Sequence, residues 1–133
     1  MKIAICPGSY DPVTYGHLDI IKRSAVLVDK LIVTVFVNPS KKASLFSIEE
    51  RLDMLRETTK DIPNVEVDTS TGLLNVYAAS KNCHLIIRGL RAFSDFEYEF
   101  QRALMIKKID PTLETAFFMT DGRYSYLSST GVR

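Results

Sequence analysis

The chain has 133 residues, 46% of them hydrophobic and 25% charged, and its 17 basic and 16 acidic side chains leave a net charge of +1. This length suits one domain with a single core, and the balanced charge lacks the basic surface of nucleic-acid-binding proteins. No apolar run approaches the roughly 20 residues of a membrane span, and the apolar start is too short for a signal peptide. We therefore expect a cytoplasmic protein with no nucleic-acid or membrane partner, whose Cys6 and Cys83 are buried free thiols.

The N-terminal stretch predicts a strand, a loop and a helix in that order. Residues 1–6 are a short apolar run suited to a strand buried on both faces, and the prolines and glycines between Pro7 and Gly16 exclude regular structure. Apolar residues then recur at helical spacing from Leu18 to Val28, which places His17 in the first turn of a helix. A helix start attracts phosphate, and the imidazole adds a donor aimed at the same anion. The alternative is an ordinary strand-to-helix loop with a capping or surface histidine.

Four further strands and three further helices are expected. The strands are predicted at residues 31–37, 65–67, 84–87 and 115–119, and the helices after Ser47, at 73–80 and at about 95–108. Ser47 with Glu50, and Ser94 with Glu97, match the capping-box pattern at two of these helix starts. Five strands alternating with helices predict an α/β fold in a single domain over residues 1–133: a five-stranded parallel sheet with helices on both faces.

Ligands of such sheets bind beyond the carboxyl ends of the strands, and polar residues gather at those ends. They are Ser9, His17, Lys41, Arg88, Arg91 and the segment 128–130, with Leu74 beyond the third strand. Cations and hydrogen-bond donors suit phosphoryl or nucleotidyl transfer, in which positioning and charge stabilisation supply most of the catalysis. No nucleophile paired with a base stands out, so direct in-line displacement without a covalent enzyme intermediate is expected.

Each of these positions also has a plainer interpretation. Arg88 lies at the mouth of a buried strand, and its planar fork suits a phosphate. The alternative for Arg88 is a structural salt bridge to an acidic residue of the next helix, namely Asp95, Glu97 or Glu99. Lys41 taken alone would be a solvated loop residue, and the segment 128–130 a helix N-cap.

Several motifs resemble one family. Thr14-Tyr15-Gly16-His17 looks like the Thr/His-x-Gly-His motif of the nucleotidyltransferase superfamily, and Pro-Gly-Ser-Tyr-Asp-Pro at 7–12 is similar to the opening of bacterial phosphopantetheine adenylyltransferases. Further matches to that family follow in order at residues 39–42, 47–51, 88–92, 95–99 and 128–130. The resemblance covers essentially the whole chain and implies a Rossmann-like nucleotidyltransferase fold.

The resemblance also implies a reaction, in which AMP passes from ATP to 4′-phosphopantetheine to give dephospho-coenzyme A and pyrophosphate, with Mg²⁺ required. The implied catalytic residues are His17, Ser9 and Lys41, and the implied substrate-binding residues are Ser9, Lys41, Leu74 and Arg88. The implied ATP-binding residues are Ser9, Tyr10, His17, Gly89, Leu90, Arg91, Glu99, Tyr124, Ser125, Tyr126, Leu127, Ser128, Ser129 and Thr130. Members of the family are hexameric, so the resemblance implies a homohexamer with coenzyme A as a possible product inhibitor. No residue is assigned as a metal ligand.

The chain departs from the family pattern near residue 133. Gly131 stands where a larger aliphatic residue is expected, and a single domain lacking a C-terminal helical segment is expected from the sequence. Two other functions stay open at this point. One is another adenylyl- or cytidylyltransferase of the superfamily, acting on nicotinamide mononucleotide or a polyol phosphate. The other is a non-catalytic ATP-binding module, which would bind ATP without releasing pyrophosphate.

Overall fold

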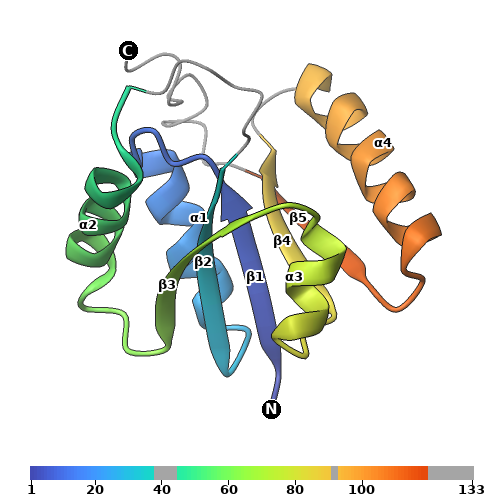
Figure 1. The fold of residues 1–133 in the computed structure, drawn as a ribbon, viewed down its shortest axis with the longest axis horizontal. Coiled ribbons are helices and arrows are strands. Elements are labelled where there is room, and N and C mark those ends of the chain that lie inside the picture. The colour runs from blue at the N-terminus through green and yellow to red at the C-terminus, as the bar shows by residue number, and fades with distance from the viewer. Residues whose placement is uncertain (38–44, 91–92, 120–133) are drawn as a thin grey trace.

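The computed structural model describes residues 1–37, 45–90 and 93–119, with the side chains of residues 93–96 excepted (Figure 1). Within these ranges the elements in chain order are β1 (Ile3–Gly8), α1 (Tyr15–Ala25), β2 (Lys30–Val37), α2 (Ile48–Thr59), β3 (Val65–Thr71), α3 (Leu74–Ser80), β4 (Leu85–Leu90), α4 (Phe93–Ile109) and β5 (Glu114–Met119). The regular alternation of strands and helices confirms the predicted α/β class.

The strands form one parallel sheet in the order β3-β2-β1-β4-β5. The chain builds outward from β1 to β3 and then crosses back to place β4 on the other side of β1. In such folds a ligand cleft lies where the strand order reverses. The carboxyl ends of β1 and β4 are therefore the expected position of a binding site.

Helices cover both faces of the sheet, as predicted. Alternate residues of β1 point to opposite faces: Cys6 packs in one buried cluster with Ile21 of α1 and Leu55 of α2. Ile5 packs in a second cluster with Tyr77 of α3, against which Ile106 of α4 also lies. Figure 1 shows α3 on the near side of the sheet and α1 on the far side. A parallel sheet buried on both faces explains why its strands read as continuous apolar runs.

Three predicted strands differ from the observed ones by more than one residue at an end. The first strand is Ile3–Gly8 rather than 1–6, β3 continues to Thr71 rather than ending at 67, and β4 is Leu85–Leu90 rather than 84–87. The apolar pattern stops earlier than the hydrogen-bonded ladder, because polar residues at the rim pair through their backbones. Gly89 and Leu90 consequently belong to the end of β4 and not to a loop after it.

One predicted helix start is confirmed and one is wrong. Ser47 Oγ accepts a hydrogen bond from the Glu50 amide at 3.1 Å, and the Glu50 carboxylate accepts one from the Ser47 amide at 2.9 Å, which is a capping box at the start of α2. In contrast, α4 begins at Phe93, so Ser94 lies inside the helix and cannot be its N-cap. Serine and glutamate at this spacing mark a helix start only where the serine backbone is non-helical, and the backbone of Ser94 is helical.

A polar chain crosses the apolar layer between the sheet and α3. Thr34 Oγ1 donates to the Tyr77 hydroxyl at 3.0 Å, and that hydroxyl donates to Asp68 Oδ2 at 2.6 Å. Burial raises the pKa of Tyr77, and the hydrogen bond to Asp68 raises it further. Burial acts to raise the pKa of Asp68 too, but hydrogen bonds from Tyr77, Thr69 and Lys81 outweigh it and leave that pKa below its usual range. The chain fixes α3, which carries one wall of the cavity described below.

Replacing Tyr77 with phenylalanine is expected to lower the free energy of unfolding by about 1–3 kcal/mol at pH 7, because the buried Thr34 and the half-buried Asp68 lose their shared partner. A carboxylate with a depressed pKa contributes stability above its unfolded value near 4, and this contribution is lost as the pH falls through the folded value. The difference from wild type should therefore shrink at pH 3. Urea unfolding at both pH values measures this difference in the free energy of unfolding. Tyr98→Phe is the control, because Tyr98 is exposed. An equal difference at the two pH values would contradict the role of Asp68.

Candidate active site

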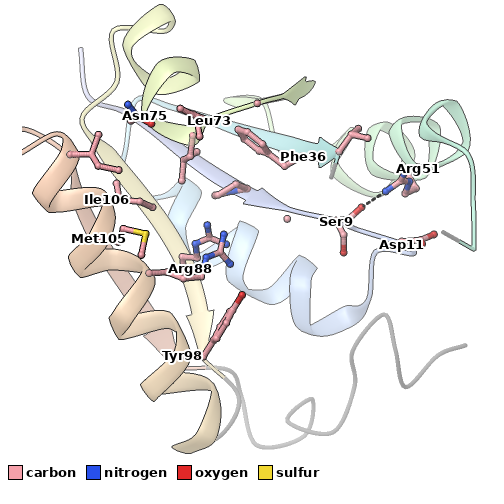
Figure 2. Close-up of a pocket in the computed structure, with 17 residues that line it drawn as sticks. Ser9, Asp11, Phe36, Arg51, Leu73, Asn75, Arg88, Tyr98, Met105 and Ile106 are labelled. Atoms are coloured by element: carbon pink, nitrogen blue, oxygen red, sulfur yellow. Dashed lines mark hydrogen bonds between the residues drawn. The ribbon is translucent and has the colours of Figure 1, made fainter. Parts of the chain in front are cut away.

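A cavity of about 800 Å³ opens on the α3–α4 face at the carboxyl ends of β1, β2 and β4 (Figure 2). Its polar lining includes Ser9, Asp11, Arg51, Asn75, Arg88 and Arg102, and its apolar lining includes Phe36, Leu73, Leu74, Met105, Ile106 and Ile109. The size lies within the range of ligand pockets, and a mainly apolar wall with a few placed charges is their usual composition. The cavity can therefore take a long ligand with one anionic group.

Three predicted substrate-binding residues lie together in this cavity. Ser9 follows β1, Leu74 begins α3 and Arg88 lies in β4, and all three contribute to the lining. Figure 2 shows Arg88 between α4 and the end of β1 that carries Ser9. Residues far apart in the sequence thus meet at one rim, as the parallel-sheet argument predicted. Lys41, Arg91 and the segment 124–130 lie outside the described residues.

The loop after β1 folds back over its own strand. Tyr10 has a positive φ of 47°, and its ring is buried, with the hydroxyl donating to the Cys6 carbonyl at 2.9 Å. A Cβ on Gly8 would lie 3.1 Å from Cε2 of that ring, so Gly8 gives Tyr10 its place. The side chain of Tyr10 therefore packs beneath the loop. The backbone of Tyr10 is the part of this residue that is placed to contact a nucleotide.

His17 is held in the first turn of α1 by a capping box with Thr14. The Thr14 amide donates to His17 Nδ1 at 2.9 Å, and the His17 amide donates to Thr14 Oγ1 at 3.3 Å. Because Nδ1 accepts a backbone proton, the neutral imidazole carries its own proton on Nε2. An edge-to-face contact with the Tyr10 ring, at 5.0 Å between ring centroids, also orients the imidazole of His17. The predicted position of His17 is confirmed, and its ring is a hydrogen-bond donor in a fixed orientation.

Asp11 ties this loop to a distant segment, which the sequence analysis missed. Its carboxylate is 1% exposed, and it accepts hydrogen bonds from the amides of Leu45 at 2.7 Å and Phe46 at 2.8 Å. Arg51 of α2 adds a second tie, since its Nη1 donates to the Ser9 carbonyl at 3.1 Å. Hydrogen bonds to a charged group are the stronger class, so the shape of the loop depends on Asp11.

Replacing Asp11 with asparagine is expected to lower the free energy of unfolding by about 1.5–3 kcal/mol, because an amide NH₂ faces one of the two backbone donors. Urea unfolding measures the change. Asp61→Asn provides the control, because Asp61 is exposed and surface substitutions stay within about 0.5 kcal/mol. Equal stability of the two variants would show that Asp11 does not hold the loop.

Arg88 forms part of a small charge network on the cavity wall. Its Nε lies 3.4 Å from Glu99 Oε2, and Arg102 Nη1 lies 3.4 Å from Glu99 Oε1. Burial lowers the pKa of Arg88, and the nearby Arg102 lowers it further, while Glu99 acts in the opposite direction. Arginine stays charged even so. The structural salt bridge considered for Arg88 therefore exists, with Glu99 as the partner, and Arg88 lines the cavity as well.

Within the described residues, no helix is long and apolar enough to span a membrane. The same residues bring together no group of three or more His, Cys, Asp or Glu side chains of the kind that holds a metal. Both cysteines are buried free thiols, as predicted.

Comparison with known proteins identifies the family. The model of a family described as cytidylyltransferase-like matches residues 5–133. A phosphopantetheine adenylyltransferase of Caldanaerobacter subterraneus subsp. tengcongensis is 62% identical over all 133 residues, which cover 82% of that relative. The chain belongs to the phosphopantetheine adenylyltransferase family. A second family member, from Clostridium tetani, is 56% identical over the same 133 residues and is also covered to 82%.

A more distant likeness supports the fold of this phosphopantetheine adenylyltransferase family member. Nicotinic acid mononucleotide adenylyltransferase of Plasmodium falciparum, solved in complex with NaAD, superposes with a TM-score of 0.67 at 15% identity. The match covers 97% of this chain and 80% of that one. The Rossmann-like nucleotidyltransferase fold and the family resemblance inferred from the motifs are both confirmed.

Proposed function

We propose that this chain transfers AMP from ATP to 4′-phosphopantetheine, forming dephospho-coenzyme A and pyrophosphate. The observation that carries the proposal is the 62% identity to a phosphopantetheine adenylyltransferase across the full 133 residues. The cavity supports it, because a charged rim and an apolar wall suit a phosphate attached to a long flexible arm.

The phosphate of 4′-phosphopantetheine would bind at Arg88, together with Lys41. A guanidinium with free donors suits a phosphate, which it can bind in a bidentate manner. The arm would then lie along Leu74 and the neighbouring apolar side chains of the cavity, with Ser9 at its phosphate end. This arrangement aims a phosphate oxygen toward the loop after β1.

ATP would bind on the other side of that loop, at His17, Ser9, the backbone of Tyr10, the segment 89–91, Glu99 and the segment 124–130. A phosphate oxygen of 4′-phosphopantetheine attacks the α-phosphorus, the bond to the β-phosphate oxygen breaks, and pyrophosphate leaves with that oxygen. The Nε2–H of His17 would donate to the α-phosphate as its charge grows in the transition state. The side chains thus act by position and charge, and none forms a covalent bond.

Magnesium enters this proposal with the nucleotide. In nucleotide-dependent enzymes Mg²⁺ is held mainly by substrate phosphates and water, with one or two carboxylates at most. Of the residues proposed for ATP, Glu99 is the one that carries a carboxylate, which is within this limit. The ion, when bound, would neutralise charge on the pyrophosphate.

We further propose that the protein acts in the cytoplasm as a homohexamer and that coenzyme A inhibits it. Exposed apolar residues of α4 outside the cavity lining, Phe100 and Leu104, support contact between subunits. Light scattering in solution tests the hexamer, and a particle of one-subunit mass would contradict it.

The reaction is tested by pyrophosphate release from ATP with three acceptors: 4′-phosphopantetheine, nicotinamide mononucleotide and glycerol 3-phosphate. We expect release with the first acceptor alone. Turnover with nicotinamide mononucleotide alone would contradict the substrate. Binding of ATP without release in any mixture would indicate a non-catalytic module.

A further inference from the structure

The Glu99 carboxylate is shared by two guanidinium groups on the cavity wall, and the two contacts differ. Glu99 Oε1 accepts a hydrogen bond from Arg102 Nη1 at 3.4 Å. Glu99 Oε2 is buried and meets Arg88 Nε at 3.4 Å as an ion pair without a hydrogen bond. Among the described residues, Arg88 thus forms an ion pair with Glu99, but the Arg88 guanidinium donates no hydrogen bond to the Glu99 carboxylate.

We propose that Arg102 is a positioning residue for Arg88. By holding Glu99 through a hydrogen bond, Arg102 keeps the carboxylate from engaging Arg88 fully and leaves the Arg88 guanidinium to the phosphate of the acceptor substrate. The inference rests on the proposed function, because it names what Arg88 binds. It also assigns a role to a residue outside the matched motifs.

The positions of the three side chains support this division of roles. Arg102 lies three residues after Glu99 on α4, so both point from the same helix face. The exposed fractions are 13% for the Arg88 side chain, 16% for Glu99 and 43% for Arg102. Arg102 also lies 5.7 Å from the centre of the Tyr98 ring, a cation–π contact that limits its movement. The half-exposed arginine can therefore hold the buried carboxylate from the solvent side.

The charges lead to the same conclusion. Two guanidinium groups and one carboxylate leave this wall with one net positive charge, which attracts a phosphate. Without Arg102, Glu99 would balance Arg88 alone, and the wall would be neutral. Ion pairs strengthen as water is excluded, so the pair of Arg88 and Glu99 would tighten and compete with the substrate.

The first test is Arg102→Leu, which removes the charge and the donors. We expect the Kd of 4′-phosphopantetheine, measured by calorimetry without ATP, to rise about tenfold. The KM for this substrate should rise equally, while kcat stays within about twofold. Arg102→Lys should recover part of the affinity, since an ammonium also neutralises Glu99. Arg56→Leu, at an exposed arginine of α2, is the matched control and should leave every constant unchanged.

A double-mutant cycle with Glu99→Gln separates an indirect effect from direct contact. If Arg102 acts through Glu99, Arg102→Leu should change the Kd by less than twofold in the Glu99→Gln background. A tenfold change that persists there would mean that Arg102 touches the substrate itself, and it would overturn the proposal. An unchanged Kd in both Arg102→Leu and Arg102→Lys would also overturn it.

The same measurements distinguish failure of this inference from failure of the proposed function. A wild-type protein that binds 4′-phosphopantetheine but releases no pyrophosphate would contradict the proposed function alone, and the Kd values would still decide the role of Arg102. A wild-type protein that does not bind 4′-phosphopantetheine would contradict both. Thermal unfolding confirms that each variant is folded, and Arg102→Lys carries the test if Arg102→Leu is not.

Discussion

Replacing His17 with alanine is expected to lower kcat by about 10²–10³-fold, the loss typical of removing one donor to a transition-state oxyanion. The affinity for ATP should stay nearly unchanged, because a contact that strengthens only in the transition state appears in kcat and not in binding. Pyrophosphate release measures kcat, and calorimetry measures the Kd of ATP. An equal loss in kcat and in ATP affinity would place His17 in ground-state binding instead.

The same substitution removes the acceptor that caps the first turn of α1, since the Thr14 amide donates to His17 Nδ1. Loss of a cap lowers stability by about 1 kcal/mol, and this effect must be separated from catalysis. Glu50→Ala, which removes the matching acceptor of the α2 capping box, is the control. We expect a similar loss of stability there without the loss of kcat.

Replacing Arg88 with methionine is expected to raise the KM for 4′-phosphopantetheine by about 100-fold. Two hydrogen bonds to a phosphate would be lost, each worth about 1.5–3 kcal/mol, and a tenfold change in affinity corresponds to about 1.4 kcal/mol. The KM for ATP should change far less. Initial rates with each substrate varied in turn measure both constants.

Arg88→Lys is the second variant, and it should recover little of the affinity because an ammonium cannot offer a planar pair of donors. Folding should survive both changes, since Glu99 keeps its hydrogen bond with Arg102. An unchanged KM in both variants would mean that Arg88 serves only its salt bridge with Glu99.

Much of the fold was predictable because the sheet is buried on both faces. Strands such as β2 appear as unbroken β-branched runs, and the predicted 31–37 differs from the observed Lys30–Val37 by one residue. The carboxyl-edge argument then brought Ser9, Leu74 and Arg88 together before any coordinates. It needed only the direction of the strands, which the helix-length connections imply.

The supports of the site were not predictable in this way. Asp11 looks like a turn residue, yet its carboxylate binds amides 34 and 35 positions further along the chain. Every residue except proline has a backbone amide, so the sequence does not show which amides a carboxylate binds. Such a contact is seen only in the structure. Arg102 likewise looks like a solvated partner of Glu99 on one helix, and only the packing of α4 on the sheet brings that pair to Arg88 of β4.

The proposed acceptor cavity and His17 lie on different faces of the sheet. The cavity lies on the α3–α4 face, while His17 lies in the first turn of α1, the helix that covers the other face. If the acceptor phosphate and ATP meet across the end of β1, the attacking oxygen and the leaving pyrophosphate can lie in line on opposite sides of the α-phosphorus. Each turnover should then invert the handedness of that atom, so ATP made chiral at its α-phosphate would give a product of the opposite configuration.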